Sequence, residues 1–306
     1  MQYWAEEFVM RVFITGASGF LATALVPALQ QSGHEAIALV RREARDRDVQ
    51  WDPEQPLDPA KLANCDAVVH LAGKNIAGRW TDKFKRELLD SRVRGTRTLA
   101  VAVAESFRRS GRPRVFLSAS GVGYYGNRGD ELLTEESSAG TGFLAEVSKQ
   151  WEAATCAASD AGVRVVCLRI GVVLARHGGA LKPLLLPFRL GLGGRIGSGK
   201  QYWSWVALDD VVGITIFAIE NEGLCGPMNV VAPAPVRNEE FVHALGKALH
   251  RPTIFPFPEF AVRTLLGEMG QELLLTSARA LPQKLTASGY AFQYPDLANA
   301  LRAALG

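Results

Sequence analysis

Arg-Val-Phe-Ile-Thr-Gly-Ala-Ser-Gly-Phe-Leu, residues 11–21, is the stretch of sequence that decides the fold. A short apolar run ends at a glycine, and residues 21–31 then place apolar side chains at helical spacing before Gly33. This pattern predicts a strand, a tight turn and a helix. Glycines in such a turn let the backbone approach a pyrophosphate at the helix N-terminus. We therefore predict a dinucleotide-binding turn, and the alternative is a tight strand-to-helix turn that binds nothing.

Four further apolar runs follow along the chain, and each is bounded by Gly, Pro or Asp. They cover residues 35–40, 66–71, 114–118 and 163–169 and are separated by helical stretches. Strands that alternate with helices predict a doubly wound parallel sheet, and runs without strict alternation suit strands covered on both faces. The expected fold class is α/β, with a Rossmann sheet and a second, smaller C-terminal lobe that binds substrate.

The sequence changes character after Gly171, where glycine and proline become frequent. A helix is expected to begin near Asp209 or Asp210, whose carboxylates suit an N-cap, and to run through Ile219. Short segments punctuated by proline follow. We therefore assign residues 10–171 to the dinucleotide-binding domain, with residues 205–232 returning to it, and residues 172–204 and 233–306 to the smaller lobe.

Composition places the chain among ordinary globular enzymes. Its 306 residues are 48% hydrophobic and 21% charged, which argues against disorder, and a net charge of +3 is too small to indicate a nucleic-acid partner. The four cysteines show no C-x-x-C pair, which favours a reducing, cytoplasmic compartment. No apolar run approaches the roughly 18 residues of a spanning helix, so no membrane association is expected. The expected partner is a small-molecule substrate.

The end of the second predicted strand indicates which dinucleotide is bound. An acidic residue there accepts hydrogen bonds from the ribose hydroxyls, whereas an arginine meets a 2′-phosphate. The strand ends in Val40, Arg41 and Arg42, with no carboxylate, and guanidinium groups offer planar donors to a phosphate. We therefore predict NADP(H) as the cofactor. The alternative is that both arginines belong to an exposed loop.

Two other kinds of site are disfavoured by residue spacing. Ser198 lies between glycines but lacks the preceding strand and the spacing of a hydrolase nucleophile elbow. No two histidines have the spacing of metal ligands on one helical face, so no metal site is expected. The histidines are His34, His70, His177, His243 and His250.

Three motifs resemble the extended short-chain dehydrogenase/reductase superfamily. They are Thr-Gly-Ala-Ser-Gly-Phe-Leu at 15–21, His-Leu-Ala-Gly at 70–73, and Ser-Ala-Ser-Gly-Val-Gly-Tyr-Tyr-Gly at 118–126. More specifically, residues 185–199, 203–210 and 281–290 resemble the atypical epimerase-like subfamily of uncertain substrate. Its members are similar to NAD-dependent epimerases and dehydratases and carry a C-terminal domain of unknown function.

The turn and the resemblance together imply a set of site residues. Ser120 is the candidate for the hydroxyl that polarises the substrate, with Ser118 as its rival. The alternative for both is that they are serines at a strand end, where this residue type is common. The implied cofactor contacts are Gly16, Ala17, Ser18, Gly19, Phe20, Leu21, Arg41, Arg42, Leu71, Ala72, Gly73, Ser118 and Lys149.

The sequence departs from the superfamily where its catalytic tyrosine is expected. That tyrosine stands four residues before a lysine, which holds the cofactor ribose and lowers the phenol pKa. Lys149 is in the expected place, but Ala145 occupies the tyrosine position. Tyr124 is our candidate for the missing acid, whereas Tyr125 aligns with a structural tyrosine. Lys149 is otherwise a solvated helix lysine, and Tyr124 is otherwise a packing residue.

These observations lead to two functional hypotheses. The first is an NADP(H)-dependent oxidoreductase or epimerase that acts on a small hydroxyl- or carbonyl-bearing substrate, with a sugar nucleotide among the options. The second is an NADP(H)-binding sensor that has lost hydride chemistry, as Ala145 suggests. In the first, the glycine-rich loop at 191–199 is expected to cover the substrate, and Arg189 or Arg195 is available to clamp an anion.

Overall fold

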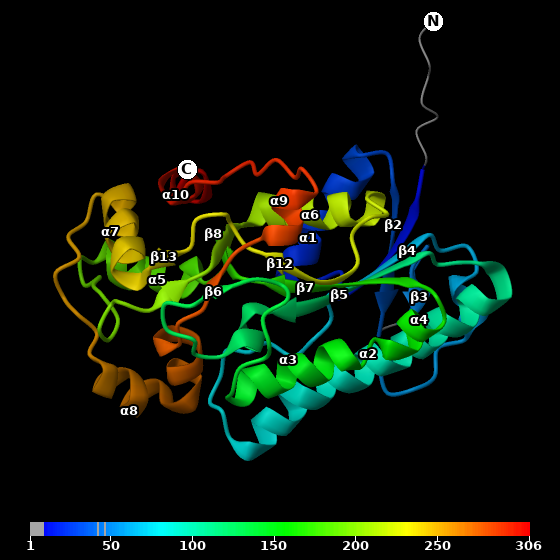
Figure 1. The fold of residues 1–306 in the computed structure, drawn as a ribbon, viewed down its shortest axis with the longest axis horizontal. Coiled ribbons are helices and arrows are strands. Elements are labelled where there is room, and N and C mark those ends of the chain that lie inside the picture. Colours follow the sequence, from blue (N-terminus) through cyan, green and yellow to red (C-terminus); the bar gives the residue numbers. More distant parts are fainter. Residues whose placement is uncertain (1–8, 42, 46) are drawn as a thin grey trace, which may run out of the picture.

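The computed structural model describes residues 9–41, 43–45 and 47–306, and its centre is a seven-stranded sheet in which every pair of neighbouring strands is parallel (Figure 1). The strand order reverses at β1, which makes the sheet doubly wound. The predicted fold class is therefore confirmed. In spatial order the strands are β12 (Gly226–Val230), β7 (Arg164–Ile170), β5 (Val115–Gly121), β4 (Ala67–His70), β1 (Arg11–Thr15), β2 (Glu35–Val40) and β3 (Val49–Gln50).

Helices cover both faces of this sheet because its strands are apolar on both sides. Val12 and Ile14 of β1 pack into the core under one helical layer, whereas Phe13, between them, packs into the core under the other. Figure 1 shows the two layers. The first contains α1 (Phe20–Gln31) and α6 (Leu208–Glu220), and the second contains α2 (Asp82–Ser110), α3 (Phe143–Ala153) and α4 (Cys156–Asp160).

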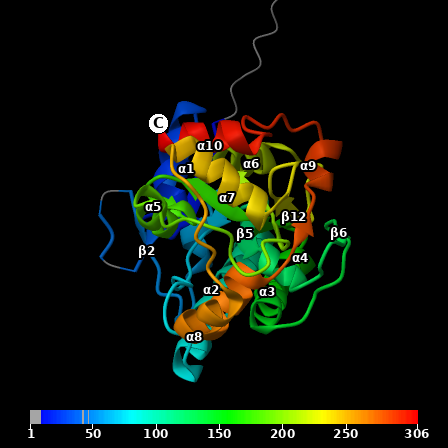
Figure 2. The same cartoon turned by 90° about the vertical axis from the view of Figure 1, so that its left-hand side faces the viewer.

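A separate apolar core supports the C-terminal lobe. Trp205 and Phe241 are fully buried at its centre. Figure 2 faces the helices of this lobe and shows α8 beside α2 and α3. The lobe elements are β8 (Val172–Ala175), β9 (Gly178–Gly179), α5 (Leu181–Arg189), β10 (Tyr202–Trp203), β11 (Trp205–Ala207), β13 (Val236–Arg237), α7 (Asn238–Leu249), α8 (Glu259–Gly270), the π-helical turn η3 (Gln271–Leu275) and α10 (Leu297–Leu305).

Short elements connect these layers. β14 pairs in parallel with β6 and thereby ties the C-terminal segment to the loop that follows β5. The short elements are η1 (Pro59–Leu62), η2 (Val122–Tyr125), β6 (Leu132–Leu133), β14 (Arg279–Ala280) and α9 (Gln283–Ala287). None of the helices within the described residues combines the length and apolar composition needed to cross a membrane.

One local expectation was wrong. The acids near the start of α6 do not cap it, because the helix begins at Leu208 with Ala207 as its N-cap and no side-chain cap. Asp210 is instead fully buried and accepts hydrogen bonds from the backbone N–H groups of Gln293 (2.7 Å) and Tyr294 (3.0 Å). Burial raises the pKa of this carboxyl group. Asp210 therefore holds the C-terminal segment against α6.

Candidate functional site

The turn between β1 and α1 depends on two glycines. Gly16 has φ +71°, and a Cβ atom placed on it would lie 2.9 Å from the backbone nitrogen of Ala72. Gly19 donates its N–H to the Gly16 carbonyl (2.8 Å) and is the N-cap of α1, which has no side-chain cap. Ser18 and Gly19 are exposed. This leaves backbone N–H groups at a helix N-terminus for an anionic ligand.

The Thr15 hydroxyl joins this turn to the end of β4. It accepts hydrogen bonds from the N–H groups of Leu71 and Ala72, both at 3.2 Å. It also lies 2.6 Å from Nδ1 of His70, which is fully buried. The structure thus brings Leu71 and Ala72 against Gly16, as the motif pattern implied. The Gly73 backbone leaves room beside the side chain of Arg92.

The remaining predicted cofactor residues lie around the same edge of the sheet. Phe20 and Leu21 begin α1 and are partly buried. Gly178 and Gly179 of β9 approach the Phe20 ring so closely that a Cβ atom on Gly178 would lie 2.2 Å from it. Arg41 follows β2 and is exposed, whereas Arg42 lies outside the described residues. The 2′-phosphate contact therefore stays a prediction.

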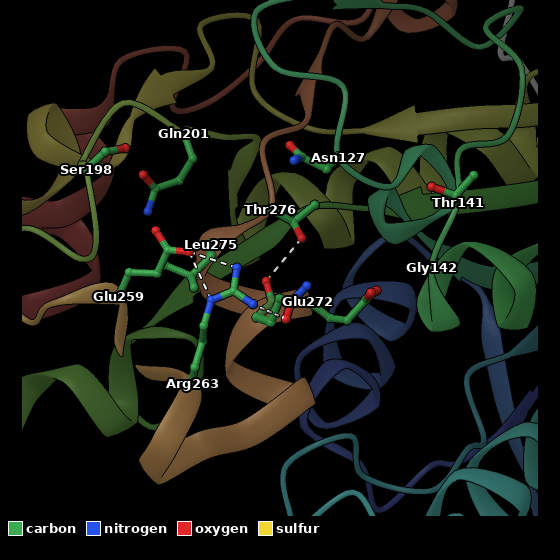
Figure 3. Close-up of a pocket in the computed structure, with 11 residues that line it drawn as sticks. Asn127, Thr141, Gly142, Ser198, Gln201, Glu259, Arg263, Glu272, Leu275 and Thr276 are labelled. Carbon is green, nitrogen blue, oxygen red and sulfur yellow. Dashed lines mark hydrogen bonds and ion pairs between the residues drawn. The ribbon is translucent and has the colours of Figure 1, made fainter. Parts of the chain in front are cut away.

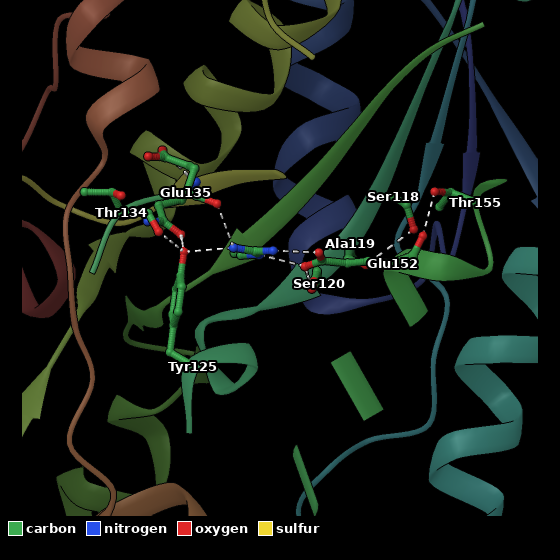
Figure 4. A network of polar contacts seen from close by, with 10 residues as sticks. Ser118, Ala119, Ser120, Tyr125, Thr134, Glu135, Glu152 and Thr155 are labelled. Atoms are coloured by element: carbon green, nitrogen blue, oxygen red, sulfur yellow. Dashed lines mark hydrogen bonds and ion pairs between the residues drawn. The ribbon is translucent and has the colours of Figure 1, made fainter. Parts of the chain in front are cut away.

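Ser120 belongs to a buried polar network at the end of β5 (Figure 4). Its hydroxyl donates to Oε1 of Glu152 on α3 at 2.7 Å. Arg169 stands beside Ser120 in the register of β5 and β7 and binds both Glu152 oxygens, each at 2.8 Å. Burial lowers the pKa of Arg169, but the hydrogen bonds and charge of Glu152 raise it more, so the guanidinium stays charged. Ser118 is buried, and its hydroxyl donates a long hydrogen bond to the Ala119 carbonyl, at 3.4 Å.

The two adjacent tyrosines differ in their surroundings. Tyr125 is fully buried, and its hydroxyl contacts the side chain of Asn229 (2.7 Å), the carbonyl of Thr134 (2.9 Å) and the guanidinium of Arg169 (3.0 Å). Burial raises the pKa of this phenol. Tyr124 is partly exposed, and the Arg169 guanidinium carbon lies 3.4 Å from its ring centroid. Arg169 therefore fixes both rings, and only Tyr124 is partly open to solvent.

Lys149 forms its ion pair outside this network. Its ammonium group is half exposed and pairs with Glu146 one turn earlier on α3, at 3.0 Å. Ala145, in the expected tyrosine position, is buried on the inner face of the helix. Whether Lys149 also reaches a ribose stays a prediction. Glu152 and Arg169 were missed in the sequence because their pairing joins a helix to a strand and follows no local motif.

A cavity of about 420 Å³ lies next to these elements (Figure 3). The segment 140–142 that forms part of its wall is tied to η2 by a hydrogen bond from Gly140 N–H to the Tyr124 carbonyl, 3.0 Å. Arg189 and Arg195, the expected anion clamps, do not line it; Arg263 does. The lining residues are Asn127, Thr141, Gly142, Ser198, Gln201, Glu259, Arg263, Gln271, Glu272, Leu275 and Thr276.

Comparisons with known proteins cover most of the chain. The NAD dependent epimerase/dehydratase family matches residues 12–231, and a domain of unknown function (DUF1731) matches residues 257–304. An epimerase family protein of Mycobacterium leprae is 43% identical over 95% of this chain and 94% of its own, and one of Mycobacterium bovis is 44% identical over 95% and 96%. The crystal structure of human epimerase family protein SDR39U1 (isoform 2) with NADPH has 36% identity and a TM-score of 0.88, covering 96% of this chain and 99% of that one.

Proposed function

The chain belongs to the NAD dependent epimerase/dehydratase family, as its motifs predicted, and on that premise we propose that it is an NADP(H)-dependent oxidoreductase or epimerase. Its substrate is a small molecule with a hydroxyl or carbonyl group. The observation that carries this proposal is the crowded turn at Gly16, whose geometry suits a pyrophosphate at the head of α1.

The residues of this turn fit a dinucleotide. A side chain at Gly16 would collide with the backbone after β4, so the glycine is needed for the turn to close. Gly19 leaves the first turn of α1 without a side-chain cap, which keeps its backbone donors available. Ser18 and Gly19, at the exposed rim, are the residues that would contact the pyrophosphate.

Two observations support NADP(H) over NAD(H). Arg41 stands exposed at the end of β2, where a ribose 2′-phosphate meets the protein in this fold. The human relative that superimposes on 96% of this chain was crystallised with NADPH. A planar guanidinium binds a phosphate with charge-assisted hydrogen bonds, so Arg41 supplies the preference, together with Arg42.

In the proposed reaction, the nicotinamide of the bound cofactor supplies or accepts the hydride. Ser120 and Tyr124 bind the reacting oxygen of the substrate, and the Tyr124 hydroxyl transfers its proton. Arg169 orients both groups, because it stacks on the Tyr124 ring and holds the Glu152 carboxylate, which accepts a hydrogen bond from the Ser120 hydroxyl. A substrate oxygen bound by Ser120 replaces Glu152 as the acceptor of that hydrogen bond.

Titration of the purified protein with NADPH and NADH tests the cofactor proposal. Energy transfer from tryptophan to the reduced nicotinamide reports binding, and we expect a dissociation constant at least roughly ten-fold lower for NADPH. Comparable affinities would contradict the role of the arginines, and no binding would refute the function. A screen of aldehydes, ketones and polyols, followed by nicotinamide absorbance at a single turnover, then tests hydride transfer.

A second function, an NADP(H) sensor without chemistry, is favoured by one observation. Ala145 stands buried where related enzymes carry the phenol, so α3 offers no acid. A sensor binds NADPH with the same preference but gives no absorbance change with any member of the screen. A structural rearrangement on binding, detected by hydrogen exchange in the C-terminal lobe, would support this second function.

A further inference from the structure

The cavity in Figure 3 has a polar lining that contains one ion pair and one further carboxyl group. Arg263 is the one cation among its described lining residues. Its Nε and Nη2 atoms donate to Oε1 of Glu259 at 2.9 and 2.7 Å, and its Nη1 donates to Oε1 of Gln271 at 2.7 Å. Because each guanidinium nitrogen already has a partner, Arg263 offers no uncompensated positive charge to a ligand.

A second acidic residue, Glu272, also lines the cavity. Glu272 accepts a hydrogen bond from the N–H group of Leu144, at the start of α3, at 3.3 Å. Burial raises the pKa of this carboxyl group and so favours its neutral form, which adds a hydrogen-bonding group to the lining and no positive charge. Two carboxylates against one guanidinium leave a formal charge of −1 on the lining at neutral pH when Glu272 is ionised.

Cations just outside the lining are also engaged. Lys85 on α2 binds Glu268 on α8 at 2.9 Å. Arg195 donates to the Ser198 carbonyl at 3.2 Å. A pyrophosphate in this cavity would meet carboxylates, while the cation of the lining, Arg263, is already paired with Glu259, which is an unfavourable arrangement for a group that carries two negative charges.

Neutral hydrogen-bonding groups complete the lining, and the protein fixes two of them from behind. Asn127 accepts from the N–H group of Ser277 through Oδ1 at 3.1 Å, so its amide nitrogen remains for a ligand. Gln201 donates through Nε2 to the carbonyls of Ile196 (3.0 Å) and Leu274 (2.9 Å), so its oxygen remains. Thr141, Ser198 and Thr276 add hydroxyl groups. Preoriented donors and acceptors of this kind suit the hydroxyl groups of a polyol.

We propose that this cavity takes an uncharged, hydroxyl-rich substrate, such as a free sugar or polyol, and excludes sugar nucleotides and sugar phosphates. The inference rests on the proposed function, since it assigns the substrate class to a cavity whose wall segment at 140–142 is hydrogen-bonded to the Tyr124 carbonyl. It departs from the option of a sugar nucleotide left open by the sequence. The lining discriminates because its guanidinium is already paired with a carboxylate, whereas its neutral groups are oriented to bind hydroxyl groups.

Saturation-transfer NMR on the NADP⁺-loaded protein tests this substrate class. The probes are D-glucose, D-xylose and myo-inositol, with glucose 6-phosphate and UDP-glucose as charged partners. We expect at least one uncharged probe to bind with a dissociation constant roughly ten-fold or more below that of either charged probe. Equal or tighter binding of a charged probe overturns the proposal, and so does the failure of every uncharged probe to bind.

Charge reversal of the lining gives an independent test. The double variant Glu259→Gln with Glu272→Gln raises the formal charge of the lining by two and releases Arg263. We expect its affinity for UDP-glucose to increase at least roughly ten-fold. The control is Glu131→Gln, which removes an exposed carboxylate that pairs with Arg128 outside the lining. We expect it to leave the affinity for UDP-glucose unchanged. No gain in the double variant, with its NADPH binding intact, overturns the proposal.

These readouts separate the substrate class from the proposed chemistry. The NMR signal reports protons of the probe and needs no hydride transfer. Preferential binding of an uncharged probe without any reduction of NADP⁺ refutes the enzyme but keeps the cavity assignment. Reduction of NADP⁺ by UDP-glucose alone keeps the enzyme and refutes the cavity assignment.

Discussion

Arg169 and Glu152 form a buried pair in which two guanidinium nitrogens meet the two carboxylate oxygens, each at 2.8 Å. Arg169 comes from the end of β7 and Glu152 from α3, so the pair clamps a strand of the sheet to a helix of the covering layer. The same carboxylate accepts a hydrogen bond from the Ser120 hydroxyl, and the same guanidinium stacks on the Tyr124 ring. Stability and the candidate active site therefore depend on one interaction.

Glu152→Ala is expected to destabilise the protein strongly. The substitution leaves the Arg169 charge buried without its partner and leaves the Ser120 hydroxyl without its acceptor. Breaking a buried pair of this kind costs about 3–5 kcal/mol. Urea unfolding followed by far-ultraviolet circular dichroism measures this loss. The matched control is Glu146→Ala on the same helix, whose pair with Lys149 is exposed and should contribute nothing measurable. Equal losses in the two variants would contradict the importance of burial.

Gly16→Ala is expected to abolish NADPH binding. Its φ of +71° disfavours a side chain, and the new Cβ atom would also press on the backbone of Leu71 and Ala72 at about 3 Å. Gly33 offers a matched control, because it has φ +82° but nothing within 4 Å of the Cβ position. Gly33→Ala should cost about 1–2 kcal/mol of stability and leave the NADPH dissociation constant unchanged. Retained affinity in Gly16→Ala would show that the turn does not hold the cofactor.

Arg41→Gln is expected to reduce the preference for NADPH over NADH. A charge-assisted hydrogen bond is worth about 1.5–3 kcal/mol, which corresponds to roughly a ten- to hundred-fold rise in the NADPH dissociation constant. The NADH constant should change little, because NADH has no 2′-phosphate. Fluorescence titration gives both values. A parallel rise in both constants would mean that Arg41 contacts a part of the cofactor that the two dinucleotides share.

Much of the sheet is predictable from the sequence because its signals are local. Residues 11–15 and 35–40 are continuous apolar runs next to turn residues, and they became β1 and β2 with the same bounds. The glycine turn was equally predictable, since the tolerance of a positive φ, as at Gly16, is a property of glycine itself. Phe20 and Gly178 are separated by most of the Rossmann fold, and nothing local predicts their contact.

The cavity and the polar network were harder to predict because they assemble from distant segments. Arg263 lies in a helix whose acidic and basic residues are those of a solvated surface, and only the fold places it in the same cavity lining as residues 141 and 142. Asp210 was expected to cap its own helix, whereas burial beside the C-terminal segment gives it better donors at Gln293 and Tyr294. The positions of these side chains therefore depend on long-range packing, which local sequence propensity does not predict.

His70 is expected to make the protein less stable in acid. The Thr15 hydroxyl accepts hydrogen bonds from two backbone N–H groups, so its O–H donates a hydrogen bond to Nδ1 of His70. The proton of the neutral imidazole is then on Nε2. Burial lowers the pKa of His70 to about 3, from 6.5 when exposed. The unfolded chain then binds one more proton than the folded chain between these values. Stability falls by about 1.4 kcal/mol per pH unit as pH drops from 6.5 toward 3.

Urea midpoints between pH 7 and pH 4 measure the contribution of His70. The His70→Asn variant keeps a polar atom near the position of Nδ1 but cannot titrate. The slope of its stability against pH should therefore be smaller than that of the parent protein, by the amount that one bound proton contributes. Identical slopes in the variant and the parent protein would show that His70 is not the titrating group.

Tyr124→Phe is expected to lower the turnover number by about 10²–10⁴-fold while it leaves NADPH affinity unchanged, because general acid catalysis contributes a factor of that size. Single-turnover absorbance with a substrate from the screen gives the rate. The ring remains stacked on Arg169, so the substitution removes only the hydroxyl. Tyr125→Phe is the contrasting variant: its hydroxyl is fully enclosed by Asn229, Thr134 and Arg169, so its loss should reduce stability more than the proton-transfer rate. An unchanged rate in Tyr124→Phe would show that the Tyr124 hydroxyl is not the acid and would leave Ser120 as the candidate hydroxyl.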